Sequence, residues 1–218
     1  MVMAVNIARQ GQELVAMEES SREGFEGVRL ILIDEATDGG KYAQELMRNC
    51  EKLAQNSQGA GLTDIKEVLQ QIAATTESSG SARVLIAHFA HQALHVANIG
   101  DTGFLIIRNG VIFKKSSPMV HEFNFPYAIG SGIDLLEAVE EYHFEVEDGD
   151  VIIAATDGLF DNIYEQEVAS IVSKSVGAGM EPKQTTALGP TATKRSRHTR
   201  RWSCKGVIRS QEKLMVAG

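Results

Sequence analysis

The sequence predicts an α+β fold (a layered α/β architecture), in which a sandwich of antiparallel sheets is flanked by helices. Two stretches in the first third of the chain repeat apolar residues at helical spacing. The chain then changes to short apolar runs joined by tight turns, which is typical of strands in hairpins. Helices segregated from hairpins favour layered antiparallel sheets over a doubly wound parallel sheet.

The first expected element is a buried strand over 28–33, a short apolar run that leads into a turn of carboxylates and glycines. A helix follows, and its apolar face consists of Tyr42, Leu46, Cys50 and Leu53. The polar stretch 56–61 ends that helix. Thr63 can cap a second helix, whose apolar residues are Ile65, Val68, Leu69 and Ile72.

Hairpins are expected in the middle of the chain. Short turns separate four apolar runs, which cover 82–89, 93–99, 104–108 and 111–115. Asn109-Gly110, between the last two runs, is a strong hairpin signal because both residue types accept positive φ. The runs therefore predict a four-stranded antiparallel meander over 82–115.

Two strands and a helix are expected after the meander. Residues 142–147 alternate apolar and polar side chains with period two, and Asp148-Gly149 forms the next turn. A buried strand over 151–155 then ends at Thr156-Asp157-Gly158. The stretch 165–175 reads as a helix with an apolar side.

The net charge of −8 combines an acidic body with a basic tail. Residues 1–180 hold 12 Lys and Arg against 27 Asp and Glu, whereas residues 181–218 hold 9 against 2. We expect residues 1–27 to be a weakly structured lead-in and residues 28–180 to form the folded domain. The basic run in 181–218 has no apolar period, which predicts a disordered tail.

Composition excludes several classes of protein. No apolar run approaches the roughly 20 residues of a membrane span, and the acidic body would repel the phosphates of a nucleic acid. The start of the chain lacks the pattern of a secretory signal, so we expect the protein to act inside the cell, in the cytoplasm or nucleus. We also expect it to be a monomer. Cys50 and Cys204 are too few for a disulfide framework.

Carboxylates at the ends of expected strands are the candidate site. Asp157, Asp101 and Asp34 each follow an apolar run, and three such acids can converge if their strands are neighbours. Clustered carboxylates suit hard cations such as Mg²⁺ or Mn²⁺. Each acid taken alone also fits an ordinary turn. His88, His91 and His95 alternate faces along strands, so we expect no shared metal site there.

Two motifs resemble those of the type 2C metal-dependent serine/threonine protein phosphatases, in the plant branch. Residues 94–110, which contain Ala97-Asn-Ile-Gly-Asp-Thr102, resemble the "ANxGDS" hairpin of that family. Residues 150–162 resemble its "DGDxxxxxSDGLWD" strand. Shorter similarities, which extend the resemblance over about 28–176, lie at 38–47, 79–82 and 121–127.

The resemblance implies a sandwich of antiparallel sheets and hydrolysis of phosphoserine and phosphothreonine in phosphorylated protein substrates, with Mg²⁺ or Mn²⁺ as cofactor. By motif position, Asp157 matches a core metal ligand and Asp101 an acid that helps to hold an additional ion. Asp161, Gly158 and Gly100 match supporting positions. Full-length relatives act in plastids or mitochondria as well as in the cytosol or nucleus.

The chain departs from the family pattern at both ends. The "DGxGG" motif is absent, and Asp34 is the nearest substitute for its metal-bridging acid. Past residue 183 the family's final "DDITV" strand is also absent, so 28–180 resembles a truncated, partial phosphatase domain. We therefore expect impaired phosphatase activity in this form. The alternative is a non-catalytic pseudophosphatase that acts as a regulatory or interaction protein.

Overall fold

The computed structural model divides the chain into two compact units, one of Met1–Arg9, Gly103–Ser117 and Glu147–Gly218, the other of Gln10–Thr102 and Pro118–Val146. Each unit contains a five-stranded sheet, and we name the units after the middle strands of these sheets, β11 and β4. The structure describes residues 2–6, 13–18, 29–35, 41–56, 65–90, 93–123, 125–130, 139–179 and 204–207.

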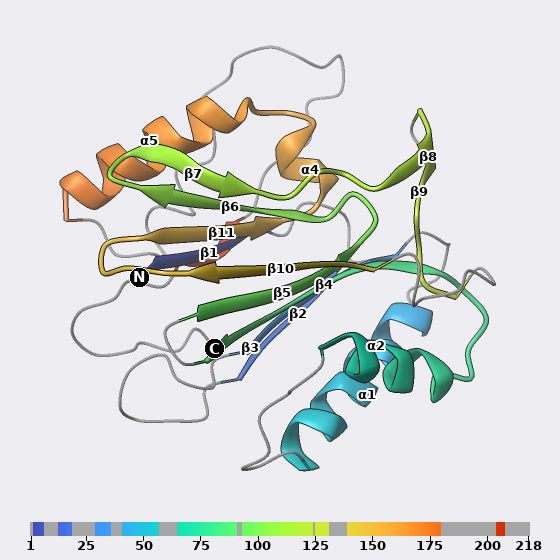
Figure 1. Ribbon diagram of the computed structural model, residues 1–218. Coiled ribbons are helices and arrows are strands. Elements are labelled where there is room, and N and C mark those ends of the chain that lie inside the picture. Colours follow the sequence, from blue (N-terminus) through green and yellow to red (C-terminus); the bar gives the residue numbers. More distant parts are fainter. Residues whose placement is uncertain are drawn as a thin grey trace. The chain divides into compact units, whose positions relative to one another are not determined.

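The β4 unit is an antiparallel sheet with two helices beside it (Figure 1). Its strands run in the order β10-β5-β4-β3-β2, and every pairing is antiparallel. Their bounds are Glu13–Glu18 for β2, Arg29–Glu35 for β3, Ala82–Ala90 for β4, Ala93–Ile99 for β5 and Glu140–Glu145 for β10. The helices are α1 (Lys41–Asn56) and α2 (Ile65–Ala74), and β8 (Val120–Glu122) pairs with β9 (Phe125–Pro126).

Alternate side chains of this sheet pack against the helices, which explains the apolar stripes. The buried cluster joins Ile31, Ile33, Val84, Ile86 and Ile99 of the sheet to Tyr42, Leu46, Cys50, Ile65, Leu69 and Ile72 of α1 and α2. The residues between them on the strands, such as Leu32 and Leu85, are also buried. Strands buried on both faces read as continuous apolar runs, as this sequence does.

The β11 unit is a mixed sheet in the order β12-β1-β11-β6-β7. Strand β1 pairs with β11 in parallel, and the other pairings are antiparallel. The bounds are Val2–Asn6 for β1, Gly103–Arg108 for β6, Val111–Lys115 for β7, Val151–Ala155 for β11 and Cys204–Val207 for β12. Two helices follow β11, namely α4 (Asp157–Phe160) and α5 (Glu165–Gly177).

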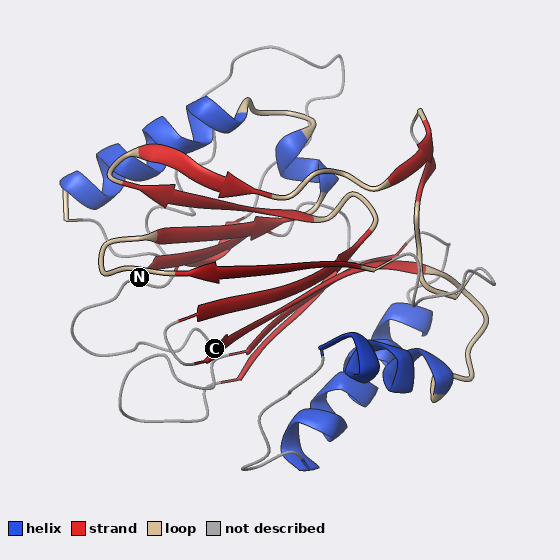
Figure 2. Ribbon diagram, viewed as in Figure 1, coloured by secondary structure: helices blue, strands red, loops and turns tan. Residues whose placement is uncertain are grey.

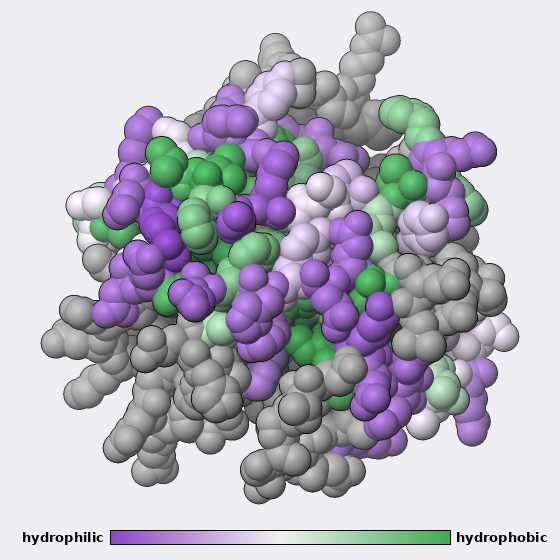
Figure 3. All heavy atoms as spheres, in the orientation of Figure 1, coloured by the Kyte–Doolittle hydropathy of each residue, from purple (hydrophilic) through white to green (hydrophobic). Residues whose placement is uncertain are grey.

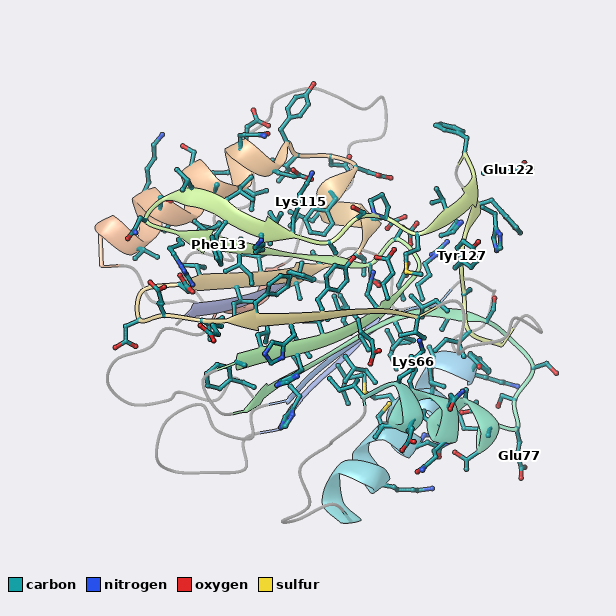
Figure 4. All side chains as sticks on the ribbon, in the orientation of Figure 1. Lys66, Glu77, Phe113, Lys115, Glu122 and Tyr127 are labelled. Atoms are coloured by element: carbon teal, nitrogen blue, oxygen red, sulfur yellow. The ribbon has the colours of Figure 1, made fainter. Side chains whose placement is uncertain are left out.

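Helix α5 lies along this sheet, next to β7 (Figure 2). Its Val168, Ala169 and Val172 belong to a buried cluster with Leu105, Ile107, Val151 and Ile153 of β6 and β11. On β7, by contrast, the side chains are mostly exposed. Phe113 and Lys115 are labelled on this strand in Figure 4. The helix therefore gives β6 and β11 a buried face.

The structure confirms the α+β class and the expected helices and strands, but it corrects the meander. Asn109 and Gly110 form the turn between β6 and β7, with φ of 52° and 81°. Strands β5 and β6, however, belong to different sheets. The prediction of a continuous four-stranded meander is wrong because the chain passes from one sheet to the other at residues 100–102. In this connection Gly100 O accepts a hydrogen bond from Met119 N (2.9 Å), which lies outside the strands.

Parts of both chain ends take up strand structure. The lead-in expected over 1–27 contains β1 and β2, whose apolar residues give them strand character, and the tail expected over 181–218 contains β12 at the edge of its sheet. The other residues of 181–218 lie outside the described residues. The division into lead-in, domain and tail stays a prediction.

The described surface is largely hydrophilic on the face shown in Figure 3, with separate hydrophobic patches. Large hydrophobic side chains that remain exposed are Val111, Phe113, Val120, Phe123, Phe125 and Tyr164. In the described part of the chain, no helix has both the length and the apolar character needed to cross a membrane.

Glu45 of α1 holds the segment between α2 and β4. Its carboxylate accepts hydrogen bonds from Glu77 N (2.8 Å) and Ser78 N (3.0 Å), and also from the Ser78 hydroxyl. The Ser78 hydroxyl, followed by the Glu77 amide, lowers the pKa of Glu45 below its ordinary value of 4.5. Figure 4 labels Glu77 in this segment.

This network predicts a pH-dependent contribution to stability. Because folding lowers the pKa of Glu45, its stabilising effect is complete above pH 4.5 and is lost as the pH falls through the folded pKa. Glu45→Gln should therefore lower the free energy of unfolding at pH 7, and the gap to wild type should narrow below pH 4.5. Urea unfolding at both pH values measures this. A gap that stays constant, or an equal effect from Glu141→Gln on the exposed side of β10, would contradict it.

Candidate metal centre

Asp157 is presented at the end of a fully buried strand. All five residues of β11 are buried, and Thr156 is the N-cap residue that leads into α4. Asp157 is the first residue of that four-residue helix. Its Oδ1 atom is buried and accepts no hydrogen bond within the described part of the chain. Burying a carboxylate oxygen without a hydrogen-bond donor costs free energy. Such an oxygen is suited to act as a ligand of a cation.

The other two motif residues in this unit hold the turn that carries Asp157. Asp161 is the C-cap of α4, and its N–H donates to Asp157 O (2.8 Å). The Gly158 carbonyl accepts a hydrogen bond from Asn162 Nδ2 (2.9 Å). Both therefore support the loop through backbone hydrogen bonds. Whether they also support a metal ion stays a prediction.

Asp150 and Arg108 brace the other end of β11, a feature that the sequence analysis missed. Arg108 donates from Nε to Asp150 Oδ1 (2.8 Å) and from Nη2 to Asp150 Oδ2 (2.7 Å), and its Nη1 donates to Glu147 (2.7 Å). The hydrogen bond with Asp150 raises the pKa of Arg108. The sequence did carry a signal for this ion pair, because Arg108 is the one charged residue in the apolar strand β6 and ends it.

Asp34 and Asp101 share one arginine in the β4 unit. Asp34 lies within β3 rather than just after it, directly opposite Arg83 of β4. Arg83 Nη1 donates to Asp34 Oδ2 at 2.6 Å, and Arg83 Nε forms an ion pair with Asp101 Oδ1 at 3.0 Å. All three side chains are largely buried. The structure thus unites two of the three predicted acids, around a cation of the chain itself.

The two arrangements differ in whether they could bind a divalent ion. The buried Asp157 oxygen, which has no hydrogen-bond donor in the described part of the chain, could bind one. Asp34 and Asp101 do not fit one as they stand, because the guanidinium occupies the position between them. No group of three His, Cys, Asp or Glu side chains that could hold a metal is found among the described residues. Asp101 and Asp157 belong to different units, so their predicted proximity stays a prediction.

Three histidines form a row across the β4 unit. His88, His95 and His143 occupy directly opposed positions on β4, β5 and β10. The Nδ1 atoms of His95 and His143 are 3.1 Å apart. Spacing along the chain did not show this alignment because it depends on strand register.

Comparisons with known proteins bear on this site. No family model matches the chain. The chain is 50% identical over 154 residues to probable protein phosphatase 2C 62 of Arabidopsis thaliana, which covers 71% of this chain and 21% of the relative. This chain is homologous to plant type 2C protein phosphatases. It is also 51% identical over 150 residues to probable protein phosphatase 2C 71 of Oryza sativa subsp. japonica, covering 69% of this chain and 32% of that one.

Solved structures of other phosphatases share the fold. The X-ray structure of the photosystem II phosphatase PBCP matches with a TM-score of 0.72 at 25% identity, over 86% of this chain and 78% of that chain. The catalytic domain of PstP, solved in complex with 2 manganese ions, matches with a TM-score of 0.57 at 14% identity, over 79% and 83%. The chain spans about a fifth to a third of the length of the plant relatives named above.

Proposed function

We propose that this chain acts as a metal-dependent protein serine/threonine phosphatase with impaired turnover. The sequence identity of 50% and 51% to two plant type 2C phosphatases, over 154 and 150 aligned residues, supports this function. The observation that carries it is the buried oxygen of Asp157, which lies within the matching motif and lacks a hydrogen-bond donor in the described part of the chain.

Asp157 is the residue that would hold Mg²⁺ or Mn²⁺. When bound at such a site, the ion supplies an activated water and neutralises charge on a phosphoryl group. The β11 strand and the α4 turn fix the Asp157 carboxylate in place, since Asp161 N–H and Asn162 both hold that turn. A rigid ligand keeps the geometry that phosphoryl transfer needs.

The impairment follows from the other two acids. Arg83 offsets one of the two negative charges of Asp34 and Asp101 and pairs with oxygens of both, so the two acids offer a second ion less charge. The substrates we propose are phosphorylated proteins, on which the chain acts as a monomer without nucleic acid or membrane. Its compartment, cytoplasm or nucleus in this form, stays a prediction.

Phosphate release from a phosphothreonine peptide tests the proposal. With Mn²⁺ present, we expect the purified chain to release phosphate at least about 100-fold more slowly than a complete type 2C phosphatase, because part of the transition-state stabilisation is missing. Asp157→Asn should abolish the residual activity. Turnover as fast as that of a complete enzyme would contradict the impairment.

The second candidate is a non-catalytic regulatory protein. The capture of Asp34 and Asp101 by Arg83 favours it, since a two-ion site needs free carboxylates. Equal background rates for wild type and Asp157→Asn would support this candidate and contradict the phosphatase proposal.

A further inference from the structure

Arg83 lies where three neighbouring strands bring two acids together. Asp34 on β3 is directly opposite Arg83 on β4, and Asp101 follows β5, the next strand of the sheet. The Arg83 side chain is 15% exposed, and those of Asp34 and Asp101 are 5% and 17% exposed. In so buried a place, two carboxylates need a positive partner to remain charged.

Gly100 opens the path that Arg83 takes to Asp101. An ideal Cβ on Gly100 would lie 2.7 Å from Arg83 Cγ and 2.8 Å from Arg83 Cβ. Any side chain at this position would therefore push the arginine stem away. The glycine allows the stem to cross the end of β5 and to place Nε 3.0 Å from Asp101 Oδ1.

The guanidinium and a divalent ion compete for the same oxygens. Mg²⁺ and Ca²⁺ need carboxylate oxygens to converge at about 2.0–2.6 Å. Here Asp34 Oδ2 already accepts from Arg83 Nη1 at 2.6 Å, which leaves no space for an ion on that side. The positive charge of the Arg83 guanidinium also repels an approaching cation.

We propose that Arg83 is a built-in counter-ion, which occupies the Asp34–Asp101 site and keeps divalent cations out of it. The inference concerns binding within the β4 unit and is independent of whether the chain hydrolyses phosphate. It predicts a latent cation site, which removal of the guanidinium should open to Mn²⁺.

Binding of Mn²⁺, measured from the EPR signal of the free ion, tests the proposal on the full chain. All variants carry Asp157→Asn, which removes the other candidate ligand. Adding Arg83→Met, which keeps an apolar stem beside Gly100, should tighten Mn²⁺ binding at least about tenfold. Adding Asp34→Asn as well should abolish that gain. Arg83→Lys keeps the positive charge and should produce no gain.

Two outcomes would overturn the proposal. One is an Arg83→Met variant that is folded by circular dichroism yet binds Mn²⁺ no more tightly than its parent. The other needs no change at Arg83: if adding only Asp34→Asn to the Asp157→Asn parent weakens Mn²⁺ binding, Asp34 already holds the ion beside the arginine. This second measurement decides the question even if Arg83→Met does not fold.

Discussion

Arg108→Met is expected to lower the free energy of unfolding by about 3–5 kcal/mol, because it leaves the buried Asp150 carboxylate without its positive partner. The Asp150 side chain is 1% exposed and receives two hydrogen bonds from Arg108. The same guanidinium lies 3.9 Å from the centre of the Phe113 ring, and this contact is lost as well. Urea unfolding followed by circular dichroism measures the loss.

Two control variants separate the buried charge from other effects. Lys115→Met breaks the ion pair between Lys115 and Glu165 (2.8 Å), in which the two side chains are 50% and 32% exposed. This variant should lower the free energy of unfolding by less than about 1 kcal/mol. Adding Asp150→Asn to Arg108→Met removes the stranded charge and should recover part of the loss. A double variant no more stable than Arg108→Met would show that the charge is not the cause.

Local patterns in the sequence predicted α1, α2, α5, β3 to β7, β10 and β11, but not β1, β2, β8, β9, β12 or α4. The apolar stripe of α1 and the Asn109-Gly110 turn depend only on neighbours along the chain, and both agree with the structure. Sheet membership depends on distant pairings, and there prediction was weaker. The parallel pairing of β1 with β11 joins residues far apart in sequence, and the change of sheet after β5 has no signature in a short window.

The candidate site shows the same division. Strand-end acids could be recognised because each follows its own apolar run. The role of Arg83 could not, since it depends on the register that places Arg83 opposite Asp34, 49 residues away. Residue type also misled in one respect: Asp34 and Asp101 were interpreted by the ion they suit in general, whereas a neighbouring strand supplies a cation of its own.

Gly100→Ala is expected to cost about 2–5 kcal/mol of unfolding free energy. Gly100 has φ of +99°, which an L-residue adopts only with strain. Its new Cβ would lie 2.6 Å from the Tyr127 carbonyl oxygen, a backbone atom, and within 2.8 Å of two Arg83 atoms. The strain and the overpacking add together, and displacement of Arg83 would weaken its ion pairs with both acids.

Gly149→Ala is the matched control for this prediction. Gly149 has φ of +91°, but nothing lies within 4 Å of its ideal Cβ. It should therefore show the backbone strain alone, about 1–2 kcal/mol. The difference between the two variants in urea unfolding isolates the close packing around Gly100. Equal losses would mean that the Tyr127 and Arg83 contacts relax without cost, and that the glycine serves only the turn.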